Sequence, residues 1–234
     1  MRRLPGVGAL AAAAVATTLL TTTGVASASA STGVLDLELN EARAAGTAVD
    51  SSGHHHDAQI GSRVRMGGGH ATFPVLARDA ALGTAPLVRV PDARDGSLDP
   101  GKGTFTIVMR YRTTHGYGNI LQKGQATSAG GQVKLQQPGG RLTCMFKTSR
   151  GRATAGSGSV TMDNGAWHTV RCVRTATSVT MYVDGRRTGR STHSTGDLDN
   201  SMPWTIGGKP DCDGTRVDCD YFAGDVDYVR LTKG

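Results

Sequence analysis

The chain has 234 residues, a formal net charge of +7 and four cysteines, and only 5% of its residues are aromatic. A chain of this length accommodates one all-β domain behind a short leader, because β-sandwiches often reach about 200 residues without dividing. With 33 glycines and few windows that repeat at the helical spacing, the composition argues against a helical bundle. It favours many short strands joined by turns.

The N-terminus has the composition of a secretory signal peptide. A basic start at residues 1–3 is followed by an Ala-rich apolar stretch at 10–20 and by small residues in A-x-A spacing up to Ala30. The apolar stretch is too short to span a bilayer, and no later segment is apolar enough for a membrane helix. We therefore predict a signal peptide at 1–30 and one secreted, extracellular and monomeric domain at 31–234.

Strands are predicted wherever apolar and polar residues alternate, because a period of two places one set of side chains on a buried face. In chain order, the predicted strands are Val34–Asn40, Thr72–Ala77, Leu87–Val90, Thr104–Arg112, Gly118–Lys123, Gln132–Gln136, Arg141–Lys147, Ser159–Met162, Trp167–Arg174, Ser178–Gly185, Arg186–Gly189, Trp204–Gly207 and Asp225–Leu231. Turns recur about every ten residues, which is typical of an all-β sandwich of two antiparallel sheets.

All four cysteines lie in the part of the chain predicted to be exported, where an oxidising environment favours disulfides. Of the three pairings that four cysteines allow, we predict Cys144–Cys172 and Cys212–Cys219. The first would tie two strands in the middle of the domain, and the second would close a small polar loop. Zinc binding is the alternative, but a zinc site needs more closely spaced ligand pairs.

Four motifs, in this order, resemble the laminin G-like domains of the concanavalin A-like lectin/glucanase superfamily, in a secreted bacterial form. They are the Asp-Ser-Ser-Gly turn at Asp50–Asp57, the strand at Thr104–Met109, the Trp-His to Tyr-Val-Asp-Gly hairpin at Trp167–Gly185, and the ending at Phe222–Arg230. The resemblance implies a jelly-roll β-sandwich. Residues 63–99 match least, and the strand order there stays open.

The resemblance implies a non-catalytic binding domain for carbohydrate or another extracellular or cell-surface ligand. A divergent secreted glycoside hydrolase of the same superfold and a protein–protein adhesion module are the alternatives. Hydrolases of this superfold use paired carboxylates, commonly two glutamates on one strand. This chain has only Glu38 and Glu41, and their spacing directs them to opposite faces of a strand. We therefore predict no catalytic residues.

The resemblance also implies a structural Ca²⁺ ion between the first and last strands. Asp227 would supply a carboxylate, and Asp50 and Asp57 lie in the turn that would complete the site, since Ca²⁺ prefers oxygen ligands. Asp225 and Asp227 are two residues apart and would share a face, so they would repel each other without a cation. Arg230, an odd number of residues from both, is expected to point the other way.

Candidate ligand-binding residues are few. Apolar sugar faces stack on aromatic rings, and Tyr117, between two glycines, is the aromatic residue most expected at the surface. Trp167 and Trp204 are expected in the core. Arg186 and Arg187 form the best local basic patch, which would suit a glycan or other anionic extracellular polymer, although an ordinary solvated surface is the alternative. No motif for binding nucleic acid accompanies them.

Overall fold

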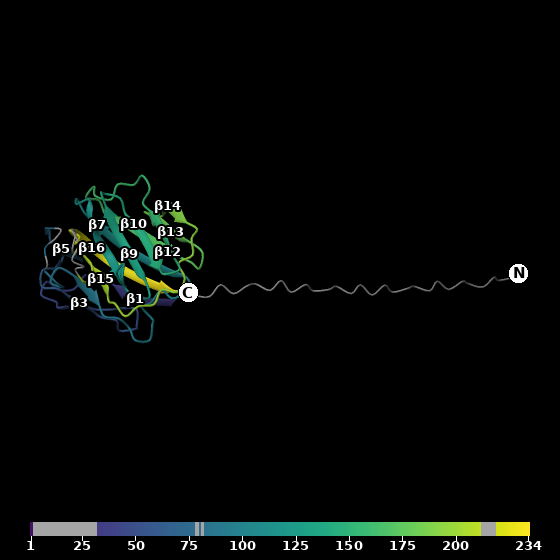
Figure 1. Ribbon diagram of the computed structural model, residues 1–234, viewed down its shortest axis with the longest axis horizontal. Coiled ribbons are helices and arrows are strands. Elements are labelled where there is room, and N and C mark those ends of the chain that lie inside the picture. Colours follow the sequence, from purple (N-terminus) through teal and green to yellow (C-terminus); the bar gives the residue numbers. More distant parts are fainter. Residues whose placement is uncertain (2–31, 78–79, 81, 212–218) are drawn as a thin grey trace.

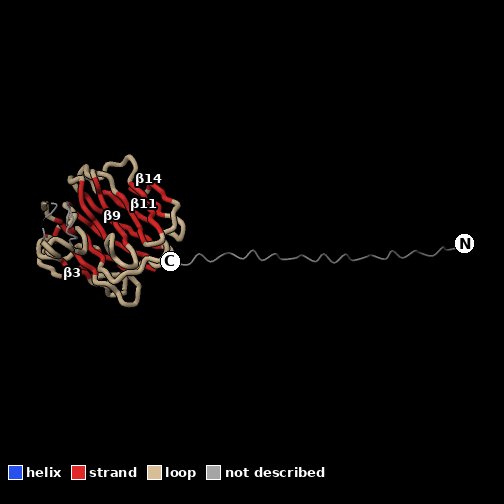
Figure 2. Tube along the Cα trace, in the orientation of Figure 1, coloured by secondary structure: helices blue, strands red, loops and turns tan. Residues whose placement is uncertain are grey.

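The computed structural model describes Met1, residues 32–77, Ala80, and residues 82–211 and 219–234. The predicted signal peptide, apart from Met1, lies outside the described residues. Within these ranges the chain forms two antiparallel eight-stranded sheets that pack as a β-sandwich (Figures 1 and 2), so the predicted fold class is confirmed. The described residues form no helix, and so none of the length and apolar character needed to cross a membrane.

The first sheet, sheet A, contains the last strand of the chain near its centre. Its strands lie in the order β14 (Arg186–Ser191), β13 (Val179–Val183), β12 (His168–Arg174), β7 (Phe105–Arg112), β16 (Gly224–Lys233), β5 (His70–Phe73) and β4 (Arg65–Gly67), and β1 (Thr32–Leu37) also pairs with β16.

The second sheet, sheet B, is built mainly from the middle of the chain. Its strands lie in the order β11 (Gly151–Gly156), β10 (Thr143–Thr148), β9 (Gln132–Pro138), β8 (Tyr117–Lys123), β15 (Trp204–Ile206), β6 (Val88–Val90), β3 (Ala58–Ile60) and β2 (Thr47–Ala48). The strand order that the sequence left open at residues 63–99 is thereby settled, because β4 and β5 join sheet A and β6 joins sheet B.

One predicted strand is wrong. Residues 159–162 form no strand, and the strand in this part of the chain is β11, which ends at Gly156. The Ser157 side chain is buried, and its Oγ donates to the carbonyl of Val160 and accepts the N–H of Leu142. These bonds hold the chain in a turn, because a serine hydroxyl can replace the backbone partners that a strand would supply.

The core lies between the two sheets and follows the alternation seen in the sequence. Along β7 the inward residues Phe105, Ile107, Met109 and Tyr111 are fully buried, while their neighbours face outward. Trp204 is also fully buried, as predicted, and stacks on Phe105 with ring centroids 5.9 Å apart.

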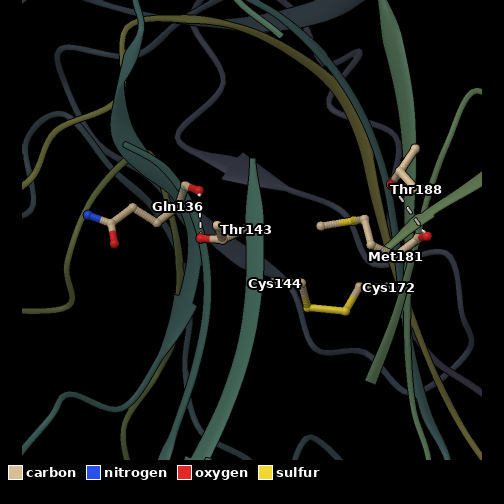
Figure 3. The surroundings of a disulfide bond; sticks show 6 residues. All are labelled: Gln136, Thr143, Cys144, Cys172, Met181 and Thr188. Atoms are coloured by element: carbon tan, nitrogen blue, oxygen red, sulfur yellow. Dashed lines mark hydrogen bonds between the residues drawn. A yellow bond between two sulfur atoms is a disulfide. The ribbon is translucent and has the colours of Figure 1, made fainter. Parts of the chain in front are cut away.

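The predicted disulfide between Cys144 and Cys172 is confirmed, with the two Cα atoms 6.5 Å apart. Cys144 lies on β10 and Cys172 on β12, so the bond crosses the core and joins the two sheets (Figure 3). The second predicted bridge involves Cys212, which lies outside the described residues.

The Trp-His and Tyr-Val-Asp-Gly motifs meet in space at the β13–β14 hairpin. Asp184 and Gly185 form its turn with φ angles of 49° and 78°, as expected for a two-residue Asp-Gly turn. The Asp184 carboxylate accepts the backbone N–H of Thr169 and lies 2.7 Å from His168 Nδ1. The aspartate of the turn therefore fastens the hairpin to the start of β12.

Candidate ligand-binding surface

A β-bulge in β16 determines which side chains face outward from sheet A. The pairing of β16 with β7 shifts register between Val226 and Tyr228, so Asp227 and Tyr228 both lie on the outer side. One extra residue reverses the alternation beyond it. Arg230 therefore faces the same side as Asp225 and Asp227, and the prediction that it points the other way is wrong.

Both aspartates have basic partners on the neighbouring strand. Arg110 Nη1 lies 2.5 Å from Asp227 Oδ2, and Arg112 Nε lies 2.8 Å from Asp225 Oδ2. The mutual repulsion from which we inferred a cation is therefore relieved by two arginines of β7. Arg230 instead bonds to Asp36 Oδ1 at 3.0 Å.

Asp50 and Asp57, predicted to take part in a Ca²⁺ site, already accept hydrogen bonds from backbone N–H groups. Burial alone would raise the pKa of Asp50, but the backbone N–H groups of Asp36, Ser52 and His56 donate to its carboxylate and lower the pKa overall. Asp57 in turn accepts the N–H of Asp50. These hydrogens occupy positions that a cation would need. No group of three or more His, Cys, Asp or Glu side chains among the described residues could hold a metal.

Trp167 lies on the outer surface of sheet A instead of in the core. It is half-buried, and the guanidinium carbons of Arg110 and Arg112 each lie 4.7 Å from its ring centroid. His70 meets the ring edge-on with the centroids 5.6 Å apart. The expected burial in the core is therefore wrong, because Trp167 precedes β12 and covers the arginines of the adjacent strand.

Tyr117 is also half-buried and is held by its hydroxyl group. The hydroxyl donates to the buried carboxylate of Asp220, and Lys209 Nζ lies 3.3 Å from the same carboxylate. Ligand binding by the Tyr117 ring stays a prediction, but its polar end is engaged within the protein.

The two glutamates take part in separate structural contacts. Glu38 pairs with Arg230, and Glu41 Oε1 accepts the N–H of Val49 at 2.9 Å. Each glutamate thus has its own partner, and the two do not act as a facing pair of carboxylates. The paired geometry required for glycoside hydrolysis is not formed by these side chains.

Arg186 and Arg187, the predicted basic patch, line a hollow of about 680 Å³, which we call the Arg187 hollow. Both arginines are exposed, and neither forms an ion pair with any described residue. Several of the other residues that line the Arg187 hollow carry hydroxyl groups. These other lining residues are Ser157, Gly158, Ser159, Val160, Val183, Asp184 and Thr188.

A second basic hollow was not predicted from the sequence. Two adjoining depressions of about 280 and 420 Å³ share Arg65 and Thr72, and we call them together the Arg65 groove. Arg43 lines one depression and His115 the other, beside the exposed side chain of Val75. These residues come from separate segments, so no local run of basic residues could have revealed the groove.

The charge balance of the Arg65 groove is positive. Asp225 is the one carboxylate among its described lining residues, and Arg112 already neutralises it. Arg43 and Arg65 are exposed, and within the described part of the chain neither has a carboxylate partner. Two guanidinium groups thus stay available to an anionic ligand.

Comparison with protein-family models agrees with this fold. Residues 82–234 match the family model Laminin_G_3, which is described as the Concanavalin A-like lectin/glucanases superfamily. Among solved structures, domains LG4-5 of the mouse laminin α1 chain are similar, with 24% sequence identity and a TM-score of 0.46. This similarity covers 57% of the present chain and 37% of the laminin chain, well under half of its length. No curated protein matches the chain.

Proposed function

Because the chain belongs to the concanavalin A-like lectin/glucanases superfamily, we propose that its domain is a non-catalytic module that binds an acidic extracellular polysaccharide. Laminin G-like domains are generally binding modules, although the superfamily also includes glycosidases. The observation that carries the proposal is the pair of hollows lined by arginines that have no carboxylate partner among the described residues.

The chemistry of these hollows suits sugar units that bear carboxylate or sulfate groups. A guanidinium group donates two parallel hydrogen bonds to such an anion, and hydroxyl groups such as those of Ser159 and Thr188 can bond to sugar hydroxyls. Aromatic platforms contribute little, because the half-buried Trp167 ring packs against Arg110 and Arg112. Charge is therefore expected to contribute more to affinity than stacking, and binding should weaken as salt is added.

The test is a glycan array that contains acidic polysaccharides and neutral polysaccharides of matched size, with and without added salt. We expect the acidic members to bind and salt to weaken that binding. Equal binding to neutral members, or no binding at all, would contradict the proposal. Release of reducing sugar from a bound polysaccharide would favour the hydrolase alternative instead.

Two charge-reversal variants locate the binding surface. Arg43→Glu/Arg65→Glu alters the Arg65 groove, and Arg186→Glu/Arg187→Glu alters the Arg187 hollow. Loss of charge-assisted hydrogen bonds worth about 1.5–3 kcal/mol should weaken binding at least tenfold in whichever variant removes the site.

The matched control for these variants is a double substitution of exposed arginines that line neither hollow, Arg94→Glu/Arg152→Glu. It makes the same change in net charge and should keep most of the affinity. If all three variants weaken binding equally, the attraction depends on net charge alone and neither hollow is a site.

A further inference from the structure

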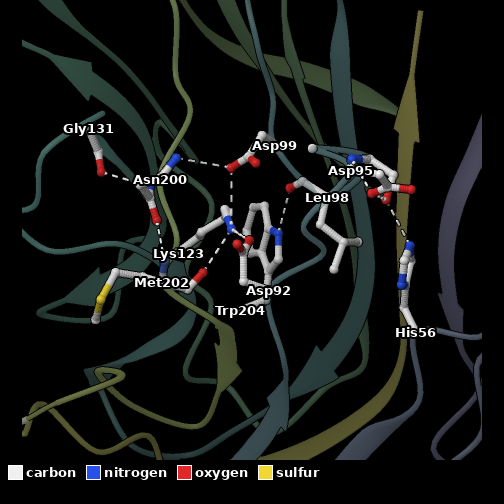
Figure 4. A network of polar contacts seen from close by, with 12 residues as sticks. His56, Asp92, Asp95, Leu98, Asp99, Lys123, Gly131, Asn200, Met202 and Trp204 are labelled. Atoms are coloured by element: carbon white, nitrogen blue, oxygen red, sulfur yellow. Dashed lines mark hydrogen bonds and ion pairs between the residues drawn. The ribbon is translucent and has the colours of Figure 1, made fainter.

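Lys123 is enclosed between two aspartates inside the sandwich (Figure 4). The lysine side chain, at the end of β8, is fully buried. Its Nζ lies 2.5 Å from Asp92 Oδ1 and 3.3 Å from Asp99 Oδ1, and it donates to the carbonyl of Met202 at 2.8 Å. Both aspartates belong to the segment that follows β6, so the contacts join separate parts of the chain.

Most of this cluster is shielded from water, and the Asp92 side chain is 19% exposed. Trp204 and Leu98 are fully buried beside it, and the indole N–H of Trp204 donates to the Leu98 carbonyl at 2.9 Å. The Asp99 side chain is only 6% exposed. Ions held in such a site lose their hydration, and their mutual attraction often does not compensate for that loss. A reaction that removes two of the charges is therefore favoured here more than it would be in water.

A proton held by the cluster would serve such a reaction. One lysine and two ionised aspartates would leave an uncompensated negative charge in a largely buried site. Burial raises the pKa of Asp99, although Lys123 partly opposes the shift. A protonated Asp99 beside an ionised Lys123–Asp92 pair makes the cluster neutral. The cluster then holds a nucleophile, a carboxyl group to be attacked and a second carboxyl group that can carry protons.

From this geometry we propose that Lys123 and Asp92 condense into an intramolecular amide bond, with Asp99 transferring protons. A proton passes from the Lys123 ammonium to the Asp92 carboxylate, which gives an amine and a carboxylic acid. The amine attacks Asp92 Cγ, and Asp99 relays a proton from the nitrogen to the departing hydroxyl. One N–C bond forms, one C–O bond breaks, and one water molecule leaves. No atom changes oxidation state, and Asp99 is regenerated.

The amide would cross-link β8 of sheet B to the segment that leads from β6 towards β7 of sheet A. The bond would persist in reducing conditions, unlike the Cys144–Cys172 disulfide. This inference is independent of the proposed ligand, because none of the three residues lines either arginine hollow.

The experiment is mass spectrometry of the full chain after folding, reduction of disulfides and digestion. We expect one branched peptide that contains both Asp92 and Lys123, lighter than the sum of its two parts by one water molecule. A lysine-specific protease should fail to cleave after Lys123. Separate, unmodified peptides around Asp92 and Lys123 in the folded protein would overturn the proposal and leave an ordinary ion cluster.

Two variants distinguish chemistry from folding. Asp99→Asn keeps the shape of the side chain but cannot transfer the proton as a carboxyl group, so we expect uncross-linked peptides from a protein that still forms the Cys144–Cys172 disulfide. Asp95→Asn alters the exposed neighbour that bonds to Ser97 and should keep the cross-link. A cross-link retained in folded Asp99→Asn would overturn the role of Asp99.

Discussion

At the scale of single residues, most charged groups that are buried or half-buried have partners within the protein. Arg174 is the extreme case, because it is fully buried and has no carboxylate partner within the described part of the chain. It donates instead to the carbonyls of Gly101, Gly103 and Gly196, and burial lowers its pKa. These carbonyls belong to loops that lie far from Arg174 in the sequence. The residues next to Arg174 in the chain therefore could not predict that it binds these loops.

Asp50 should make folding sensitive to acid. Its folded-state pKa is lowered, so its contribution to stability is present above the unfolded-state pKa of 3.8 and is lost as the pH falls below it towards the folded value. Asp50→Ala should reduce the free energy of unfolding at neutral pH by about 1–3 kcal/mol, because partly buried N–H groups lose their acceptor.

The measurement for Asp50 is urea unfolding between neutral pH and pH 3, with the variant compared with the wild type. The difference between the two proteins should shrink at the acid end. The variant must be compared with the wild type because other groups also respond to pH. Burial raises the pKa of Asp99, so Asp99 stabilises the folded state as the pH falls, which is the opposite of the effect of Asp50. A difference that stays constant across the range would show that the Asp50 carboxylate is not the acid-sensitive group.

Chelation should leave the thermal stability unchanged. Arg110 already neutralises Asp227, and backbone N–H groups saturate Asp50, so we expect the same melting temperature in EDTA and in excess Ca²⁺. Asp227→Ala should lower stability by only about 0.5–1 kcal/mol, because the ion pair is partly exposed. A fall of several degrees in EDTA that Asp227→Ala abolishes would restore the predicted calcium site.

At the scale of secondary-structure elements, two local features of sheet A differ in how visible they are in the sequence. The Asp184-Gly185 turn is visible, because few residue pairs tolerate two positive φ angles in succession. The bulge at Val226–Tyr228 is not, since an extra residue in one strand is defined only by its partner strand β7. That bulge is why sequence spacing misplaced Arg230.

Three glycine substitutions should separate backbone strain from steric overlap. In Gly185→Ala the new Cβ meets nothing within 4 Å, but φ is 78°, so we expect a loss of about 1–2 kcal/mol from strain alone. In Gly130→Ala the Cβ would lie 1.5 Å from the carbonyl oxygen of Asp199, so the loss should be larger.

The matched control is Gly33→Ala, which has neither a positive φ nor a contact within 4 Å and should leave stability nearly unchanged. Chemical denaturation of the three variants gives the ranking. If Gly130→Ala is as stable as Gly33→Ala, the backbone of Gly130 does not lie as close to the Asp199 carbonyl as the structure indicates.

At the scale of the whole molecule, the fold is closed by contacts between distant parts of the sequence. β1 pairs with β16, so the first and last strands of the domain lie side by side. The Cys144–Cys172 disulfide then joins sheet B to sheet A across the core. These links join segments that lie far apart in the sequence.

Loss of the disulfide should destabilise the whole domain. The double variant Cys144→Ala/Cys172→Ala should reduce the free energy of unfolding by about 3–4 kcal/mol, because the unfolded chain gains the freedom of an open loop. Urea unfolding of the variant and of the oxidised wild type measures the loss. The reduced wild type keeps both cysteine side chains without the bond, so it separates the loss of the bond from the loss of side-chain volume. Equal midpoints for oxidised wild type and the variant would contradict a stabilising bridge.

The sequence by itself determined the sandwich class, most of the strands, the Asp-Gly turn and the Cys144–Cys172 pairing. Alternation and turn chemistry act between residues that are close in the chain, and the four family motifs indicated the jelly-roll sandwich, while the strand order at residues 63–99 stayed open. Only the tertiary structure decided that Arg110 neutralises Asp227, that Lys123 lies between Asp92 and Asp99, and that Arg43 and Arg65 border one groove. Those pairings depend on which strands become neighbours and in which register, and one bulge is enough to change the side on which a charge appears.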